Sequence, residues 1–128
     1  VYTSKYKYSI MSQAKIKSID SNGTEYDIDL YKTAPDKGSV HIATIKGGKQ
    51  LKIDTFPLYD IKRVHETDVE IECYTEVFGP DPKVTFLVTN KLYVSVVGAW
   101  ASNGTTAYPL DPKNKQILVD FINVNFPA

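Results

Sequence analysis

The residues able to act as nucleophile, acid or base are few in this chain. Its one cysteine is Cys73 and its two histidines are His41 and His65. A thiol nucleophile needs a nearby base to form the thiolate, and Cys73 with His65 could in principle supply that pair. Cys73, however, shares the apolar face of a predicted strand with Ile71 and Val77, where cysteine is usually a small core residue. We therefore predict a structural cysteine and a protein that is not an enzyme.

A second group that could do chemistry is a set of acidic residues about one predicted turn: Asp20, Glu25, Asp27 and Asp29. Carboxylate oxygens are the ligands that Ca²⁺ prefers, although the spacing here is not that of an EF-hand loop. The predicted hairpin also sets Lys17 opposite Asp27 and Lys15 opposite Asp29. The sequence therefore predicts a solvated charged face, with no metal site and no cofactor.

Aromatic residues in predicted loops are the feature that most nearly suggests a function. Nine tyrosines and one tryptophan exceed the needs of a core of this size, and several fall in loops or at strand ends: Tyr2, Tyr6, Tyr59, Trp100 and Tyr108. The longest predicted connection, Trp100 to Lys115, is of the kind that carries recognition residues. A flat ring beside amide and carboxylate groups suits a sugar, which predicts a ligand site of Trp100, Asn103, Tyr108 and Asp111. The alternative is that Trp100 and Tyr108 cap the core.

The amino-acid composition disfavours some classes of binding partner. The 15 basic and 15 acidic residues cancel, and Arg63 is the single arginine, so a phosphate-reading surface and nucleic-acid binding are disfavoured. No run of about twenty apolar residues is present, so we expect no transmembrane segment. A lone cysteine provides no disulfide framework. Asn22 and Asn103 each begin an N-glycosylation acceptor pattern, which matters if the chain enters a secretory pathway.

The elements that must position these residues are predicted to be strands. Apolar residues alternate with period two along nearly the whole chain, which indicates a single all-β domain over residues 1–128. Antiparallel hairpins at this spacing favour a β-sandwich or jelly roll of about eight strands. The alternative is a small closed barrel, in which Tyr26, Ile28, Phe86 and Val94 would line a cavity instead of filling a core.

Two hairpins can be assigned a register. A three-residue turn with Gly23 in the left-handed region pairs Ile16 with Ile28 and Ala14 with Leu30, and it brings lysines opposite aspartates on the other face. A two-residue turn at Gly47-Gly48 is predicted to set three pairs on one face and one on the other: Ile42 with Ile53, Val40 with Thr55, Thr44 with Leu51, and His41 with Asp54.

The remaining elements follow from the same alternation. We predict a strand from Val69 to Phe78, then a pair in which Phe86 faces Val94, Val84 faces Val96 and Leu87 faces Tyr93. Residues 60–66 could form one helical turn. Apolar residues on both faces of Gln116 to Phe126 predict a last, buried strand.

Three functional hypotheses follow. The first, which we favour, is a non-catalytic, lectin-like module that recognises a carbohydrate or small ligand, such as a cell-surface glycan, through its loop aromatics. The second is a structural subunit of a viral or phage particle, or of another homo-oligomeric assembly, in which aromatics and the apolar final strand pack against copies of the chain. Both favour a secreted or particle-associated protein. The third is a hydrolase or isomerase with His41 or His65 beside an acid in a deep pocket.

Overall fold

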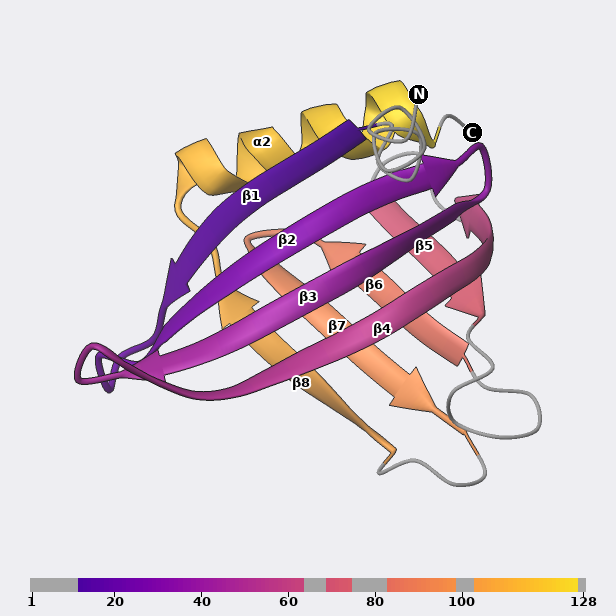
Figure 1. Ribbon diagram of the computed structural model, residues 1–128. Helices are drawn as coiled ribbons and strands as arrows, with labels where there is room; N and C mark the ends of the chain where they lie inside the picture. Colours follow the sequence, from indigo (N-terminus) through magenta and orange to yellow (C-terminus); the bar gives the residue numbers. More distant parts are fainter. Residues whose placement is uncertain (1–11, 64–68, 75–82, 99–102, 127–128) are drawn as a thin grey trace, which may run out of the picture.

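The computed structural model describes residues 12–63, 69–74, 83–98 and 103–126. These residues form eight strands and one helix, in the order shown in Figure 1. The elements are β1 (Ser12–Ile19), β2 (Glu25–Ala34), β3 (Lys37–Lys46), β4 (Lys49–Arg63), β5 (Val69–Tyr74), β6 (Lys83–Val88), β7 (Lys91–Val97), β8 (Gly104–Pro109) and α2 (Pro112–Asn125).

The strands form one antiparallel sheet in which neighbours in the chain are neighbours in the sheet. The sheet folds over, so that β1–β4 form a layer that crosses β5–β8 (Figure 1). Side chains of both layers share one hydrophobic core, with Ile28 of β2 and Phe86 of β6 among its most buried members. The all-β prediction of about eight antiparallel strands is therefore confirmed.

The two ends of the strand order, β1 and β8, meet without forming a ladder. The Ser18 hydroxyl of β1 donates a hydrogen bond to the carbonyl of Pro109 in β8. The sheet is not closed into a barrel, so the alternative of a closed barrel is wrong. Ser18 is only 1% exposed, which makes this side-chain contact a buried link between the layers.

The first hairpin has the predicted register. Ile16 lies opposite Ile28 and Lys17 lies opposite Asp27 in the β1–β2 ladder. Gly23 has a φ of 80°, the left-handed conformation that the turn requires and that glycine adopts without steric cost. The Asp20 carboxylate, which could have been a calcium ligand, instead accepts hydrogen bonds from the backbone amides of the turn and from the hydroxyl of Tyr26.

The β3–β4 hairpin starts in the predicted register and then leaves it. Lys46 lies opposite Lys49 and Ile45 opposite Gln50, as a two-residue glycine turn dictates. The next pair is Thr44 with Lys52, so Leu51 is an extra residue in β4 and forms a β-bulge.

Beyond the bulge every pair is shifted by one residue, which corrects the predicted partners. Ile42 lies opposite Asp54 instead of Ile53, Val40 opposite Phe56 instead of Thr55, and His41 opposite Thr55 instead of Asp54. Because side chains alternate along a strand, the shift turns Lys52, Asp54 and Phe56 toward the other layer and leaves Leu51 and Ile53 outside.

β4 is long enough to belong to both layers. It pairs with β3 over its first part and with β5 from Tyr59 onward, with a second register shift between Tyr59 and Lys62. Asp60 has a φ of 52° at this irregularity. Residues 60–63 are thus strand and not the predicted helical turn, whose remaining residues lie outside the described part of the chain.

The predicted last strand over Gln116–Phe126 is wrong, because residues 116–125 belong to α2 and Phe126 is the C-cap of that helix. Asp111 caps the helix by accepting a hydrogen bond from the backbone amide of Asn114 at 2.7 Å, and Pro112 stands in the first turn. Its buried residues follow helical spacing: Leu118, Phe121 and Ile122. In Figure 1 the helix runs along β1, where these side chains complete the core. No helix of the described residues is long and apolar enough to cross a membrane.

Candidate functional site

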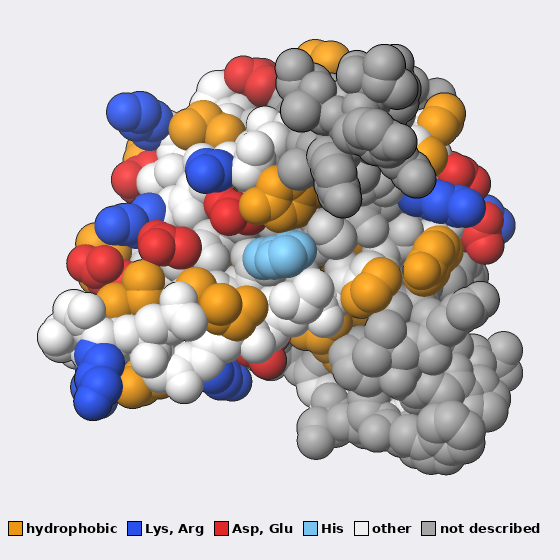
Figure 2. Space-filling model, viewed as in Figure 1, with side chains coloured by type: hydrophobic (Ala, Val, Ile, Leu, Met, Phe, Trp, Pro, Cys, Tyr) orange, Lys and Arg blue, Asp and Glu red, His pale blue; other side chains and the backbone are white. Residues whose placement is uncertain are grey.

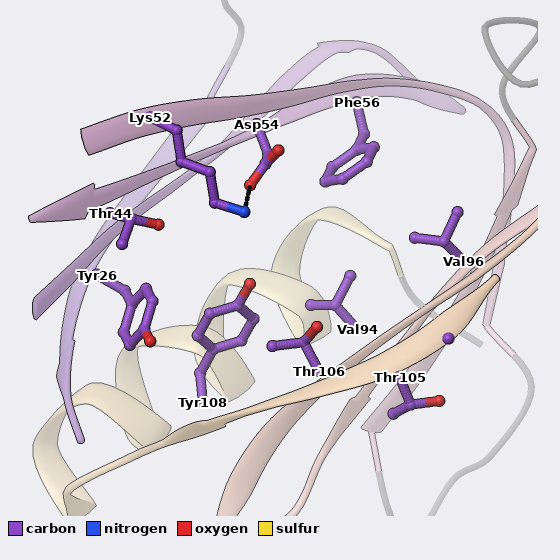
Figure 3. A pocket seen from close by; sticks show the side chains of 11 residues that line it. Tyr26, Thr44, Lys52, Asp54, Phe56, Val94, Val96, Thr105, Thr106 and Tyr108 are labelled. Atoms are coloured by element: carbon purple, nitrogen blue, oxygen red, sulfur yellow. Dashed lines mark ion pairs between the residues drawn. The ribbon is translucent and has the colours of Figure 1, made fainter. Parts of the chain in front are cut away.

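A pocket of about 450 Å³ opens between the two layers at the β4 side of the molecule. One wall comes from β2, β3 and β4, and the other comes from β7 and β8 (Figure 3). Its lining combines aromatic rings, aliphatic side chains, hydroxyls and one ion pair: Tyr26, Thr44, Lys52, Asp54, Phe56, Val94, Val96, Gly104, Thr105, Thr106 and Tyr108. A concave, partly apolar surface with a few polar groups is the usual form of a small-ligand site.

The charged part of the pocket exists because of the bulge at Leu51. Lys52 and Asp54 are two apart in β4 and therefore share its inner face, where their side chains form an ion pair of 3.5 Å. Their side chains are 65% and 40% exposed, so water screens the pair and it contributes little to stability. The pair leaves the pocket lining neutral overall while presenting both a donor and an acceptor.

Two tyrosine rings form the aromatic wall. Tyr26 of β2 and Tyr108 of β8 meet edge to face, with ring centroids 5.0 Å apart and planes at 75°. The Tyr26 hydroxyl donates to the carboxylate of Asp20, which holds the ring in place from outside the pocket. Edge-to-face aromatic pairs stabilise beyond their buried area, so this contact joins the two layers as well as lining the site.

Tyr108 is the buried member of this pair. Burial raises its pKa to about 12, with further raising contributions from the charge of Asp54 and from Tyr26, while a hydrogen bond with Thr106 opposes the rise. The phenol therefore stays protonated at any physiological pH. It can donate or accept a hydrogen bond, but it is not a base.

The opposite side of the pocket is aliphatic. Val94 and Val96 of β7 lie opposite Thr106 and Gly104 of β8, and the two valine side chains face the cavity. Thr105 points away from it in Figure 3, and its hydroxyl is hydrogen bonded to that of Ser95. Of the threonine hydroxyls, those of Thr44 and Thr106 face the cavity.

Of the four residues predicted to form a ligand site, the three that the structure describes do not form one cluster. Tyr108 lies in the pocket, on a strand and not in a loop, because β8 occupies residues that were predicted to be part of a long connection. Asn103 accepts a hydrogen bond from the backbone amide of Gly98 at 2.8 Å, and Asp111 is the cap of α2. Trp100 lies outside the described residues.

Asp111 also lies beside a shallower groove of about 370 Å³ together with Lys17 and Asn114, apart from the Tyr108 pocket. Its carboxylate already accepts two hydrogen bonds from Asn114, one from the backbone amide and one from the side-chain amide. This residue has a structural role at the helix terminus that its sequence position, directly before Pro112, was sufficient to suggest.

Three of the pocket residues that the sequence did not reveal come from β4. Lys52, Asp54 and Phe56 were expected on the other face, because the glycine turn alone sets a register without the bulge. Tyr26 and Val94 were named only for a cavity inside a closed barrel, and both line the pocket although the sheet is open. Ile28 and Phe86, named with them, are buried in the core.

His41 lies on the outer face of β3, away from the pocket. The residues on either side of it in the strand, Val40 and Ile42, are buried, and its ring packs edge to face on Tyr31 with centroids 5.1 Å apart. Among the described residues no group of three or more histidine, cysteine, aspartate or glutamate side chains could hold a metal ion. The side chain of Cys73 and all of His65 lie outside the described part.

Comparison with known proteins found no family model, no curated protein and no solved structure that matches the chain. What the protein does must therefore be argued from the pocket and from the surfaces around it.

Proposed function

We propose that this protein is a non-catalytic recognition module that binds a small neutral carbohydrate in the pocket between its two layers. The site lies in the body of the fold, with Tyr108 as its one predicted member among the described residues. A glycan on a cell surface or a free oligosaccharide would supply the same chemistry.

The observation that carries the proposal is the meeting of Tyr26 and Tyr108 with the Lys52–Asp54 ion pair in one cavity. A pyranose has an apolar face that packs on an aromatic ring and hydroxyls that hydrogen bond at its rim. Asp54 can accept from two hydroxyls and Lys52 can donate to another. Because the two charges compensate each other, the lining favours a neutral ligand over an ion.

Two further features favour binding over catalysis. The high pKa of Tyr108 keeps its phenol protonated, which suits a hydrogen-bonding group and not a general base. His41 faces away from the pocket and contacts Tyr31. The lining of the pocket therefore supplies hydrogen-bonding groups and contains neither histidine nor cysteine.

The test is a glycan-array screen followed by calorimetry on the best ligand. Tyr108→Phe removes one hydroxyl from the pocket, and we expect affinity to fall about tenfold, as for one lost hydrogen bond. Tyr93→Phe is the matched control, since Tyr93 lies opposite Leu87 on the other face of β7, away from the pocket. Equal affinity of Tyr108→Phe and the parent, or the absence of any sugar binding, would refute the proposal.

Trp100→Ala in the same screen separates the two possible sites. If Trp100→Ala loses sugar binding while Tyr108→Phe does not, the binding site lies in the connection that precedes β8 and not in the pocket. Unchanged binding by Trp100→Ala would leave the pocket as the site.

A second candidate function is that of a structural subunit in a homo-oligomeric assembly, such as a particle. The observation that favours it is the exposure of large apolar side chains, with Leu51 at 59% and Ile53 at 52%, beside a strand edge that has no second neighbour among the described strands.

A further inference from the structure

Within β4, the segment Lys52–Thr55 has a strand on one side only in the part of the chain that the structure describes. The strand pairs with β3 on one side, whereas its ladder with β5 begins only at Tyr59. Among the described residues, Lys52–Thr55 therefore has no strand on its second side, and in Figure 1 this edge forms the lower margin of the front layer. A free edge presents backbone amides and carbonyls that can pair with another strand.

Apolar side chains accompany this edge on the outer surface. Leu51 and Ile53 are more than half exposed, and Ala43 lies beside Ile53 in the ladder. Figure 2 shows hydrophobic side chains among the charged ones on this face of the front layer. A strand added at the edge would remove part of this apolar surface from water.

The residues along the edge are complementary to themselves. When two copies of one strand pair antiparallel about a two-fold axis normal to the sheet, inner residues must lie opposite inner residues. Centring the axis on Lys52 sets two ammonium groups opposite each other, and centring it on Asp54 sets two carboxylates opposite each other.

Centring the axis on Ile53 avoids both repulsions. Each Lys52 then lies opposite Asp54 of the other copy, which gives two ion pairs between the copies on the inner face. On the outer face Ile53 meets its own copy and Leu51 lies opposite Thr55. One register thus satisfies both the charges and the apolar residues.

We propose that β4 pairs with β4 of a second copy of this chain, antiparallel and centred on Ile53, so that two front layers become one continuous sheet. We assign a second copy to the edge because an antiparallel pair of identical β4 strands places each Lys52 opposite Asp54 of the other copy. This inference does not depend on the carbohydrate proposal.

The edge also sets the extent of the contact. The bulge at Leu51 ends the regular ladder on one side, and Pro57, which has no amide hydrogen, ends it on the other. The shared segment is short compared with the interfaces of permanent dimers, so we expect a dimer that dissociates on dilution.

The experiment exchanges the two charges separately. Lys52→Asp gives a chain with two carboxylates along the inner edge, and Asp54→Lys gives a chain with two ammonium groups. Each variant repels its own copy, so each alone is expected to be a monomer by sedimentation, with circular dichroism confirming the fold. An equimolar mixture places opposite charges at both positions and is expected to recover the dimer as a heterodimer.

Val124→Lys is the control, because Val124 on α2 is 77% exposed and remote from the edge. This variant is expected to dimerise like the parent. A parent that stays monomeric up to millimolar concentration overturns the proposal. So does dimerisation of the separate charge variants, since it would place the interface elsewhere, or a mixture that remains monomeric although each variant is folded.

Discussion

Asp54 lies opposite Ile42 in the β3–β4 ladder, one residue out of step with the turn at Gly47-Gly48. Leu51 is the extra residue of a β-bulge that causes this shift, and the bulge changes which side chains lie on each face of the sheet. The bulge places an ion pair in the pocket and apolar side chains outside it. Both the ligand proposal and the dimer proposal therefore depend on this one irregularity.

The register can be tested by comparing two isoleucines that the unbulged pairing would treat alike. Ile42 is 1% exposed and Ile53 is 52% exposed. Ile42→Ala should lower the free energy of unfolding by about 2–5 kcal/mol, as core truncations do, whereas Ile53→Ala should change it by about 0.5 kcal/mol or less. Urea unfolding of both variants, at a concentration where each is a monomer, measures the difference. Similar losses in the two variants would mean that Ile53 is buried and that the bulge is absent.

The first hairpin was predictable because its two faces carry different residue types. Ile16 and Ile28 belong to one face and Lys17 and Asp27 to the other, so only one register keeps charge in water. β4 lacks this contrast, since Leu51 and Ile53 are apolar yet exposed while Asp54 faces the other layer. No local pattern in such a strand specifies a bulge, and the packing of the whole sheet decides it.

The C-terminal segment was misjudged for a different reason. Residues 116–126 have apolar side chains on both faces of a hypothetical strand, which fits a buried strand, but Leu118, Phe121 and Ile122 also fit helical spacing. Asp111 followed by Pro112 is a helix start signal that decides between them. The same helix start shortens the connection on which the predicted ligand site depended, and it makes Asp111 the cap of α2.

Removing the helix cap at Asp111 should lower the stability of the protein without lowering its affinity for a ligand. Asp111→Ala removes the acceptor of the Asn114 amide and should lower the free energy of unfolding by about 1 kcal/mol. Asp120→Ala is the control, because Asp120 is an exposed residue within the same helix. Urea unfolding gives the stabilities, and calorimetry with the ligand found on the array gives the affinities, which should be unchanged in Asp111→Ala. A large loss of affinity in that variant would restore Asp111 to the ligand site.

The raised pKa of Tyr108 predicts that the protein loses stability at alkaline pH. Its pKa is raised to about 12 in the folded chain from 10.0, so the folded state holds this proton more tightly than the unfolded state does. The resulting stabilisation is fully present below pH 10 and is lost as the pH rises through 12. The loss should reach roughly 2–3 kcal/mol over that interval.

Unfolding in urea at several pH values between 9 and 12 measures this decline, and Tyr108→Phe should show a shallower one because the titrating phenol is gone. Tyr93→Phe serves again as the control. A parent and a Tyr108→Phe variant with identical pH dependence would show that Tyr108 ionises like an exposed tyrosine, and the pocket wall would then be more open to water than the structure describes.

The contribution of α2 to the core gives the last prediction. Leu118 is 0% exposed and lies in the hydrophobic cluster that joins both layers, whereas Val124 on the same helix is 77% exposed. Leu118→Ala should lower the free energy of unfolding by about 2–5 kcal/mol, while Val124→Ala should change it by about 0.5 kcal/mol or less, since alanine favours helix and no packing is lost. Because Leu118, Phe121 and Ile122 of α2 belong to the core that both layers share, the helix should unfold together with the sheet. If Leu118→Ala unfolds at the same urea concentration as the parent, α2 is peripheral and the two layers are stable without it.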